Sequence, residues 1–277
     1  MTHTILSTIT VIFGLTACMH SNHPETAENP IAASGMISPV TSTQSDSIIY
    51  DDFIFPVDSI FTAKVLTVGT FHKDEVFKNA SRFKWYGLFK SQNGYYLKQT
   101  KIKATNVYDP VLDEDEDEKT GWEIQAINED TCLILIEPLS FLTDRIVQDA
   151  KLPEHYIYPG DTIVWSYSGI NYTIFATGKK KKVQEDPDWF DVWNYKLYLT
   201  ATINGQQRKS LLVAQPGFDD QMIYLIFAGD IDGDGILDLI IDTSAHYNAT
   251  IPTIYLSKPA QAGELVKPVG GHRSVGC

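Results

Sequence analysis

The sequence lacks the local motifs that mark several common enzyme classes. It contains no Gly-x-Ser-x-Gly nucleophile elbow, no His-Glu-x-x-His zinc helix, no phosphate-binding glycine-rich loop and no Cys-x-x-Cys pair. These absences favour a protein without catalytic activity. They leave open hydrolases that use carboxylates far apart in the sequence, such as glycosidases, because no local motif marks that chemistry.

Basic residues are also few. The 22 Lys and Arg residues face 35 Asp and Glu residues, which leaves a net charge of −13. A chain this acidic is repelled by nucleic acids, so we expect no nucleic-acid partner. Part of the acidity lies in the run Asp113–Glu118, which has no glycine to turn the chain round an ion and is expected at a solvated loop tip. The opposite run, Lys179–Lys182, follows Gly178 and is expected at a hairpin tip.

Long apolar runs are absent except near the N-terminus. The run from Ile5 to Leu15 is too short for a comfortable transmembrane helix, and Leu15-Thr16-Ala17-Cys18 ends it. This pattern resembles the lipobox of bacterial lipoproteins, although no Lys or Arg precedes Ile5. The resemblance implies that residues 1–17 are a cleaved signal peptide and that acylated Cys18 anchors the protein in a lipid membrane. An ordinary secretory signal or an uncleaved anchor is the alternative.

The segment after Cys18 contains little that could be buried. Residues 18–47 are rich in Ser, Thr, Pro, Asn and Ala, so we expect a flexible linker that cannot form a core. Such a tether would hold a folded domain roughly 30 Å from a lipid surface. Met19 stands where a retention signal often carries Asp, so the lipoprotein resemblance favours the outer membrane of a bacterial cell envelope.

Cysteine is rare, with three in the chain. If Cys18 is acylated, Cys132 and Cys277 remain as a pair in a compartment that permits oxidation. They could form a disulfide that ties the last residue to a central strand. They could equally stay free, because buried free cysteines are common and the geometry of the pair cannot be read from sequence.

One short segment is dominated by aspartate. From residue 229 to 242 the chain reads Gly-Asp-Ile-Asp-Gly-Asp-Gly-Ile-Leu-Asp-Leu-Ile-Ile-Asp, which places Asp230, Asp232, Asp234 and Asp238 at loop positions 1, 3, 5 and 9. Carboxylates so close together repel one another unless a cation lies between them, and a hard, oxygen-preferring ion fits best. Position 7, Ile236, can contribute its backbone carbonyl. We therefore expect Ca²⁺ as the cofactor of this loop.

The flanks of the loop predict strands rather than helices. Ile241 occupies position 12, where an EF-hand has a bidentate Glu, and residues 221–228 and 237–243 are rich in β-branched and aromatic residues. The loop resembles the FG-GAP-type calcium loops of integrin-like β-propellers, which implies that the four aspartates are side-chain ligands and Ile236 a backbone ligand. Asp242 lies outside that pattern and is at most a supporting residue. The alternatives are a solvated Asp-Gly turn and a phosphatase-type Asp-x-Asp site, and the residues after the loop do not suit the second.

Strand-like segments dominate the rest of the chain. They cover residues 61–68, 85–89, 95–102, 122–127, 132–136, 162–167, 172–176, 195–203, 207–214, 221–228, 237–243 and 253–257. The Asn204-Gly205 pair predicts a tight hairpin, and residues 140–152 have modest helical character. These strands are too few for a propeller. We expect a mainly β fold, an antiparallel sandwich or barrel-like body, with an N-terminal β region at 48–140 and a C-terminal β region with the calcium hairpin at 141–277.

Together these features predict a membrane-anchored extracytoplasmic lipoprotein with a structural calcium site. It would act as a binding or structural module for an extracellular or periplasmic protein or glycan. The alternative is a calcium-dependent hydrolase of glycan or another extracellular polymer. Seven aromatic residues could stack on sugars, although most should belong to the core of a β domain: Trp85, Tyr86, Tyr95, Tyr96, Trp165, Trp189 and Trp193.

Overall fold

Antiparallel β-strands make up most of the structure. The structure is a computed structural model, and it describes residues 50–152, 154–184 and 189–276. These residues contain strands β1 to β18 and two short 3₁₀ helices, η1 (Asp58–Ile60) and η2 (Ala80–Arg82). All pairings between named strands are antiparallel, which confirms the predicted mainly β class. The predicted signal peptide and linker, including Cys18, lie outside the described residues.

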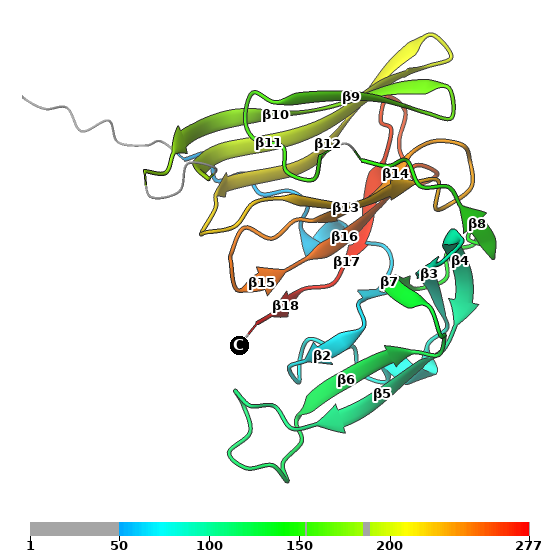
Figure 1. The fold of residues 1–277 in the computed structure, drawn as a ribbon, viewed down its shortest axis with the longest axis vertical. Helices are drawn as coiled ribbons and strands as arrows, with labels where there is room; N and C mark the ends of the chain where they lie inside the picture. The colour runs from blue at the N-terminus through cyan, green and yellow to red at the C-terminus, as the bar shows by residue number, and fades with distance from the viewer. Residues whose placement is uncertain (1–49, 153, 185–188, 277) are drawn as a thin grey trace, which may run out of the picture. The chain divides into compact units, whose positions relative to one another are not determined.

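The C-terminal half forms two four-stranded sheets (Figure 1). The long sheet has the order β12-β11-β10-β9 and consists of β9 (Thr162–Tyr167), β10 (Ile170–Lys182), β11 (Phe190–Ile203) and β12 (Gln206–Gly217). The inner sheet has the order β13-β14-β16-β17 and consists of β13 (Tyr224–Gly229), β14 (Asp238–Asp242), β16 (Pro252–Leu256) and β17 (Lys267–Gly271). A small ribbon pairs β15 (Ala249–Thr250) with β18 (Ser274–Val275).

The N-terminal half forms two further sheets. The five-stranded sheet has the order β1-β7-β3-β4-β8 and consists of β1 (Val65–Leu66), β3 (Trp85–Ser91), β4 (Gly94–Thr100), β7 (Thr131–Ile136) and β8 (Arg145–Val147). The three-stranded sheet has the order β2-β6-β5 and consists of β2 (Gly69–Phe71), β5 (Ile102–Val107) and β6 (Gly121–Ala126). The described residues belong to one compact unit.

Three apolar clusters bind these sheets into layers. One cluster joins the long and inner sheets, a second joins the inner and five-stranded sheets, and a third joins the five-stranded and three-stranded sheets. Neighbouring residues of β14 point to different clusters, with Leu239 and Ile241 in the first and Ile240 in the second. All five residues of β14 are therefore buried, which explains why this strand is a continuous apolar run between two aspartates and does not alternate. The sheets are open, so the layered architecture is observed and the barrel-like one is not.

Three expectations about local structure are wrong. Residues 140–152 form no helix and instead contain β8, because Val147 is buried in the second cluster and pairs with Tyr95. Lys179–Lys182 are not a hairpin tip, because a register shift at Gly178 lets β10 continue beside β11. The predicted strand 95–102 is divided between β4 and β5, which belong to different sheets.

The Asn204-Gly205 hairpin is confirmed. It joins β11 to β12, and both turn residues have positive φ, 52° at Asn204 and 75° at Gly205. These are the angles that a two-residue type I′ turn requires, and Asn-Gly adopts them with little strain. A local signal was sufficient here because the turn geometry depends on only two residues.

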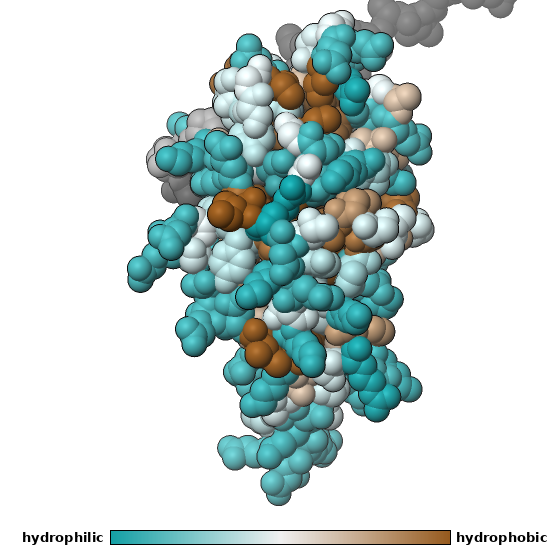
Figure 2. Space-filling view, turned by 90° about the vertical axis from the view of Figure 1, so that its right-hand side faces the viewer, coloured by the Kyte–Doolittle hydropathy of each residue, from teal (hydrophilic) through white to brown (hydrophobic). Residues whose placement is uncertain are grey.

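The surface shows no broad apolar region on the face drawn in Figure 2. Hydrophobic residues there lie in separate patches among hydrophilic ones. Scattered apolar residues of this kind are normal for a protein surface and do not mark a docking area. Among the described residues, no helix has the length and apolarity needed to cross a membrane.

Candidate metal centre

The aspartate-rich loop connects two neighbouring strands of the inner sheet. Gly229 at the end of β13 pairs with Asp238 at the start of β14, and residues 230–237 form the loop between them. The prediction that the loop joins two strands is therefore confirmed. Gly233 and Gly235 have φ of 82° and 83°, a left-handed conformation that glycine adopts without steric cost. The alternate spacing of aspartate and glycine thus curls the chain and directs carboxylates inward.

Three of the four loop aspartates converge. One carboxylate oxygen from each of Asp230, Asp232 and Asp238 lies within 4.8 Å of the others. Oxygens that bind one Ca²⁺ at about 2.3–2.6 Å are separated by at most about 5 Å, so this spacing suits an ion of that size. Asp232 and Asp238 are buried and Asp230 is half-buried. The geometry can therefore hold a metal ion.

Asp238 is the most enclosed of the three. Its Oδ2 accepts hydrogen bonds from the backbone N–H groups of Ile231 (2.7 Å) and Asp232 (2.9 Å), and its Oδ1 accepts one from Ser257 N–H (2.7 Å). Burial raises the pKa of Asp238 well above its usual value, and the charge of Asp232 adds to this effect. The carboxylate thus fixes both ends of the loop while it still needs a compensating charge.

Asp230 organises the turn itself. Its carboxylate accepts hydrogen bonds from the N–H groups of Gly233, Asp234 and Gly235, the last two at 3.0 Å. Its own N–H donates to the Tyr167 hydroxyl at 3.1 Å. These bonds satisfy consecutive backbone donors of the loop, which leaves the carboxylate in one orientation.

Asp232 and Asp234 contact the segment that follows β16. Ser257 Oγ donates to Asp234 Oδ1 at 2.9 Å, and Lys258 N–H donates to Asp232 Oδ2 at 2.9 Å. Burial raises the pKa of Asp232 to about 6, the charges of Asp234 and Asp230 contribute, and Lys258 opposes the change. Asp234 itself is exposed, so its carboxylate lies at the open side of the loop.

The long sheet holds both ends of the loop. The Tyr167 hydroxyl accepts from Asp230 N–H, and the Tyr172 hydroxyl accepts from Leu237 N–H at 3.1 Å. On another side, the guanidinium of Arg145 occupies the space that a Cβ at Gly233 would need. The loop is therefore in contact with the long sheet, with the segment after β16 and with β8.

The remaining predicted site residues do not belong to the converging carboxylates. Asp242 caps the segment after β14, because its Oδ1 accepts hydrogen bonds from Ser244 N–H (3.1 Å) and Ile251 N–H (2.8 Å). Ile236 lies in the loop with its side chain packed against the first cluster, and the role of its carbonyl stays a prediction. Cys132 is a buried free thiol whose pKa burial raises to about 12. Cys277 lies outside the described residues, so the disulfide also stays a prediction.

Three residues that shape the site were not predicted from the sequence. Ser257 and Lys258 come directly after β16 and are 25 and 26 residues away from Asp232 in the sequence. Arg145 lies within residues 140–152, for which the sequence predicted modest helical character. No motif links these positions. Only the pairing of β14 with β16 and the stacking of the five-stranded sheet bring them to the loop.

Comparison with known proteins finds no match. No protein-family model, no curated protein and no solved structure is similar to this chain at a significant level.

Proposed function

We propose that this protein is a lipid-anchored extracytoplasmic binding or structural module whose inner sheet is stabilised by a bound Ca²⁺ ion. The observation that carries the calcium part is the convergence of Asp230, Asp232 and Asp238 within 4.8 Å, two of them buried. Uncompensated carboxylates at this density and burial are unfavourable, and a divalent cation removes the repulsion.

The donor set favours a hard cation. The groups that face the loop centre are carboxylate oxygens, and the Ser257 hydroxyl lies beside Asp232 and Asp234. Oxygen ligands of this type suit Ca²⁺ and Mg²⁺ rather than the softer transition metals. Ca²⁺ accepts six to eight ligands in flexible geometry and therefore suits an irregular loop better than Mg²⁺. Asp230, Asp232 and Asp238 would hold the ion, with Asp234 and the Ile236 carbonyl as further ligands, and the ion would supply charge compensation.

The setting of the loop supports a structural role for the ion. The strands that the loop joins are buried on both faces, and hydroxyl groups of the long sheet bind both ends of the loop. Five hollows on the described surface are lined by side chains outside the loop. An ion in this position would clamp the inner sheet.

Calcium binding can be tested by isothermal titration calorimetry on the full chain after treatment with a chelator. We expect about one Ca²⁺ per chain, with a Kd in the range of about 10⁻⁴–10⁻³ M that is typical of extracellular modules. The Asp232→Asn variant should lose this binding, whereas Asp115→Asn in the exposed acidic run should keep it. Wild-type protein that releases no heat and gains no stability with calcium would overturn the proposal.

The lipid anchor rests on Leu15-Thr16-Ala17-Cys18. We expect the wild-type chain, expressed in a Gram-negative bacterium, to incorporate labelled palmitate and to fractionate with the outer membrane. A Cys18→Ser variant should lose the label and leave the membrane fraction, whereas Cys132→Ser should behave like the wild type. Equal labelling of the Cys18→Ser and wild-type chains would contradict the assignment of Cys18.

A further inference from the structure

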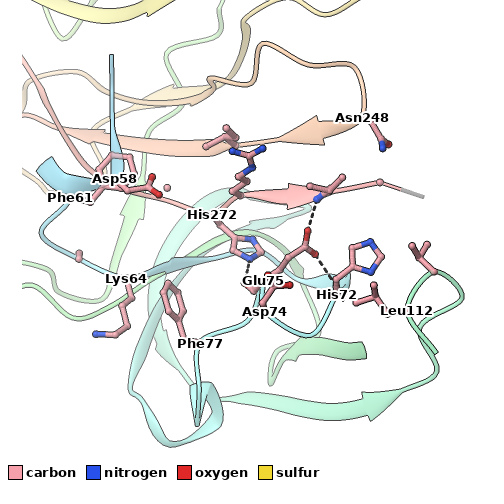
Figure 3. Close-up of a pocket in the computed structure, with 17 residues that line it drawn as sticks. Asp58, Phe61, Lys64, His72, Asp74, Glu75, Phe77, Leu112, Asn248 and His272 are labelled. Carbon is pink, nitrogen blue, oxygen red and sulfur yellow. Dashed lines mark hydrogen bonds between the residues drawn. The ribbon is translucent and has the colours of Figure 1, made fainter. Parts of the chain in front are cut away.

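A groove lies beside the C-terminal strands, and its lining includes no residue of the aspartate loop. Its cavity volume is about 770 Å³, and five separate segments line it, at residues 58–64, 72–77, 111–112, 248–251 and 271–276 (Figure 3). This volume falls within the range of pockets that take small ligands. Asp58 and Phe61 lie toward one side of the view and Asn248 and Leu112 toward the other, with Glu75 and His72 between them.

His72 presents a hydrogen-bonding nitrogen to the groove. Its Nδ1 lies 2.6 Å from Asp109 Oδ2, and its side chain is 17% exposed while that of Asp109 is 2% exposed. Within the part of the chain that the structure describes, no protein atom is hydrogen-bonded to His72 Nε2. The buried carboxylate orients the imidazole and holds the proton on Nδ1, so Nε2 is the atom that a ligand can meet.

Hydrogen bonds hold the wall beside His72 in place. Glu75 Oε2 accepts from His72 N–H at 2.8 Å, Glu75 Oε1 accepts from Val275 N–H at 2.6 Å, and the Glu75 carbonyl lies 2.9 Å from His272 Nε2. Burial lowers the pKa of His272, which therefore stays neutral and donates from Nε2. The N-terminal sheets and the C-terminal ribbon are thus joined by hydrogen bonds beside the groove.

The loop that carries Asp109 is also fixed. Asp109 Oδ1 accepts from Val111 N–H at 3.0 Å, and Asp113 Oδ2 accepts from Asp109 N–H at 2.8 Å. The prediction that the whole run Asp113–Glu118 is solvated is therefore wrong at Asp113, which is buried, while the remaining residues of the run are exposed. A pre-formed loop beside a pre-formed wall reduces the cost of ordering a ligand site.

The groove combines polar groups with exposed apolar side chains. Val111 and Leu112 are 57% and 54% exposed at the His72 end, and the rings of Phe61 and Phe77 line the other part. Apolar side chains so exposed beside charged groups suit a ligand that has both apolar faces and a polar rim. A sugar ring has this character, because its C–H faces pack on side chains while its hydroxyls form hydrogen bonds.

The charges of the groove are nearly balanced. Its lining contains three carboxylates, from Asp58, Asp74 and Glu75, and two basic groups, from Lys64 and Arg273, in a chain of net charge −13. This local balance disfavours ligands of high charge of either sign. The Nε2 atom of His72 accepts a hydrogen bond when the imidazole is neutral with its proton on Nδ1, and it donates one when the imidazole is protonated. A hydroxyl group meets either requirement, because it both donates and accepts.

We infer that this groove binds a short neutral oligosaccharide, with His72 Nε2 as a hydrogen-bonding contact and Phe77 as an apolar contact. The inference rests on the proposed binding function and adds a location and a ligand class to it. The seven aromatic residues expected from the sequence do not supply this surface, because none of them is exposed or lines the groove and Trp85 is fully buried.

The test is isothermal titration calorimetry of the calcium-saturated full chain with cellohexaose, xylohexaose, maltohexaose and hexa-N-acetylchitohexaose. We expect at least one neutral oligosaccharide to bind with a Kd of about 1 mM or less. His72→Ala and Phe77→Ala should each weaken that binding about tenfold. His246→Ala is the matched control, because His246 is exposed and does not line the groove, and it should bind as the wild type does.

Three results would overturn the inference: no binding of any neutral oligosaccharide, binding that His72→Ala and Phe77→Ala leave unchanged, or binding only of charged oligomers such as oligogalacturonate or glucosamine oligomers. Melting curves of each variant with calcium and with chelator are measured in parallel. A calcium-dependent rise in Tm without oligosaccharide binding would refute the groove assignment and leave the calcium clamp standing. If calcium does not raise the Tm of the wild type, the proposed structural role of the ion is refuted.

Discussion

Exchange of Asp232 for asparagine should have opposite effects on stability with and without calcium. Asp232 and Asp238 are buried beside each other, and burial together with neighbouring charges raises the pKa of both. In chelator the wild-type loop therefore contains unfavourable carboxylates, and Asp232→Asn relieves part of this repulsion at nearly unchanged volume. We expect the variant to melt at the same temperature as the wild type in chelator, or slightly higher.

With calcium the order should reverse. A ligand that binds only the folded state adds RT ln(1 + [L]/Kd), which is about 1.4–2.7 kcal/mol at a free concentration of roughly 10–100 times Kd. One kcal/mol corresponds to a change in Tm of about 2–4 °C in a domain the size of residues 48–277, so the wild type should gain about 3–11 °C. The Asp232→Asn variant should gain less than about 1 °C, because it lacks one of the three converging carboxylates.

Differential scanning calorimetry at about 10 mM CaCl₂ and in excess chelator measures both effects, at a calcium level well above the expected Kd. Asp115→Asn is the matched control, since Asp115 is exposed in the acidic run and its exchange should leave the calcium increment intact. Magnesium at the same concentration should give a smaller increment, because it dehydrates reluctantly and demands octahedral geometry. A wild-type increment near zero, or an increment that survives Asp232→Asn, would refute the reasoning.

Three further changes test other parts of the structure. Gly233→Ala should lower the free energy of unfolding by about 1–3 kcal/mol in urea titrations, because φ is positive and the new Cβ would overlap the Arg145 guanidinium. Gly235→Ala is the control and should lower the free energy of unfolding by less, because a Cβ there meets open space. His72 has a raised pKa through its hydrogen bond to Asp109, so its contribution to stability is fully present below its unfolded pKa of about 6.5 and decreases as the pH rises through the folded value. The difference in unfolding free energy between the wild type and His72→Gln should accordingly be larger at pH 5.5 than at pH 9, and a pH-independent difference would argue against the pair. Tyr255→Phe should cost about 1–3 kcal/mol in chemical unfolding, because it leaves the buried Leu212 carbonyl without its 2.6 Å donor, while Tyr247→Phe at an exposed position should be neutral.

The predictable parts of this protein are those that local geometry determines. The Asn204-Gly205 turn depends on two φ angles, and the curl of residues 230–238 depends on aspartates and glycines at alternate positions. Both signals are contained in a few consecutive residues, and the structure has both features. The mainly β class was predictable for the same reason, because β-branched and aromatic residues are enriched in each strand segment.

The layer order was not predictable from local patterns. β14 is a continuous apolar run, and such a run is consistent with either a buried strand or another buried element. Its position between the long and five-stranded sheets arises because Leu239 and Ile240 meet side chains from different, distant segments. The same limit applies to the groove, since His72 and Asp109 are separated by 37 residues and no motif connects them.

The position of the aspartate loop suggests why this fold would use an ion. The inner sheet is covered on both faces by apolar clusters, yet its β13–β14 connection must present backbone N–H groups that need acceptors. Asp230 and Asp238 supply these acceptors. Both carboxylates lie close to Asp232, so the groups that accept the backbone hydrogen bonds also repel one another. A cation removes that cost without any change in the hydrogen bonds, whereas neutral side chains would remove the charge and weaken the acceptors together. The loop chemistry therefore links the local need for hydrogen-bond acceptors to the calcium dependence that the Asp232→Asn experiment measures.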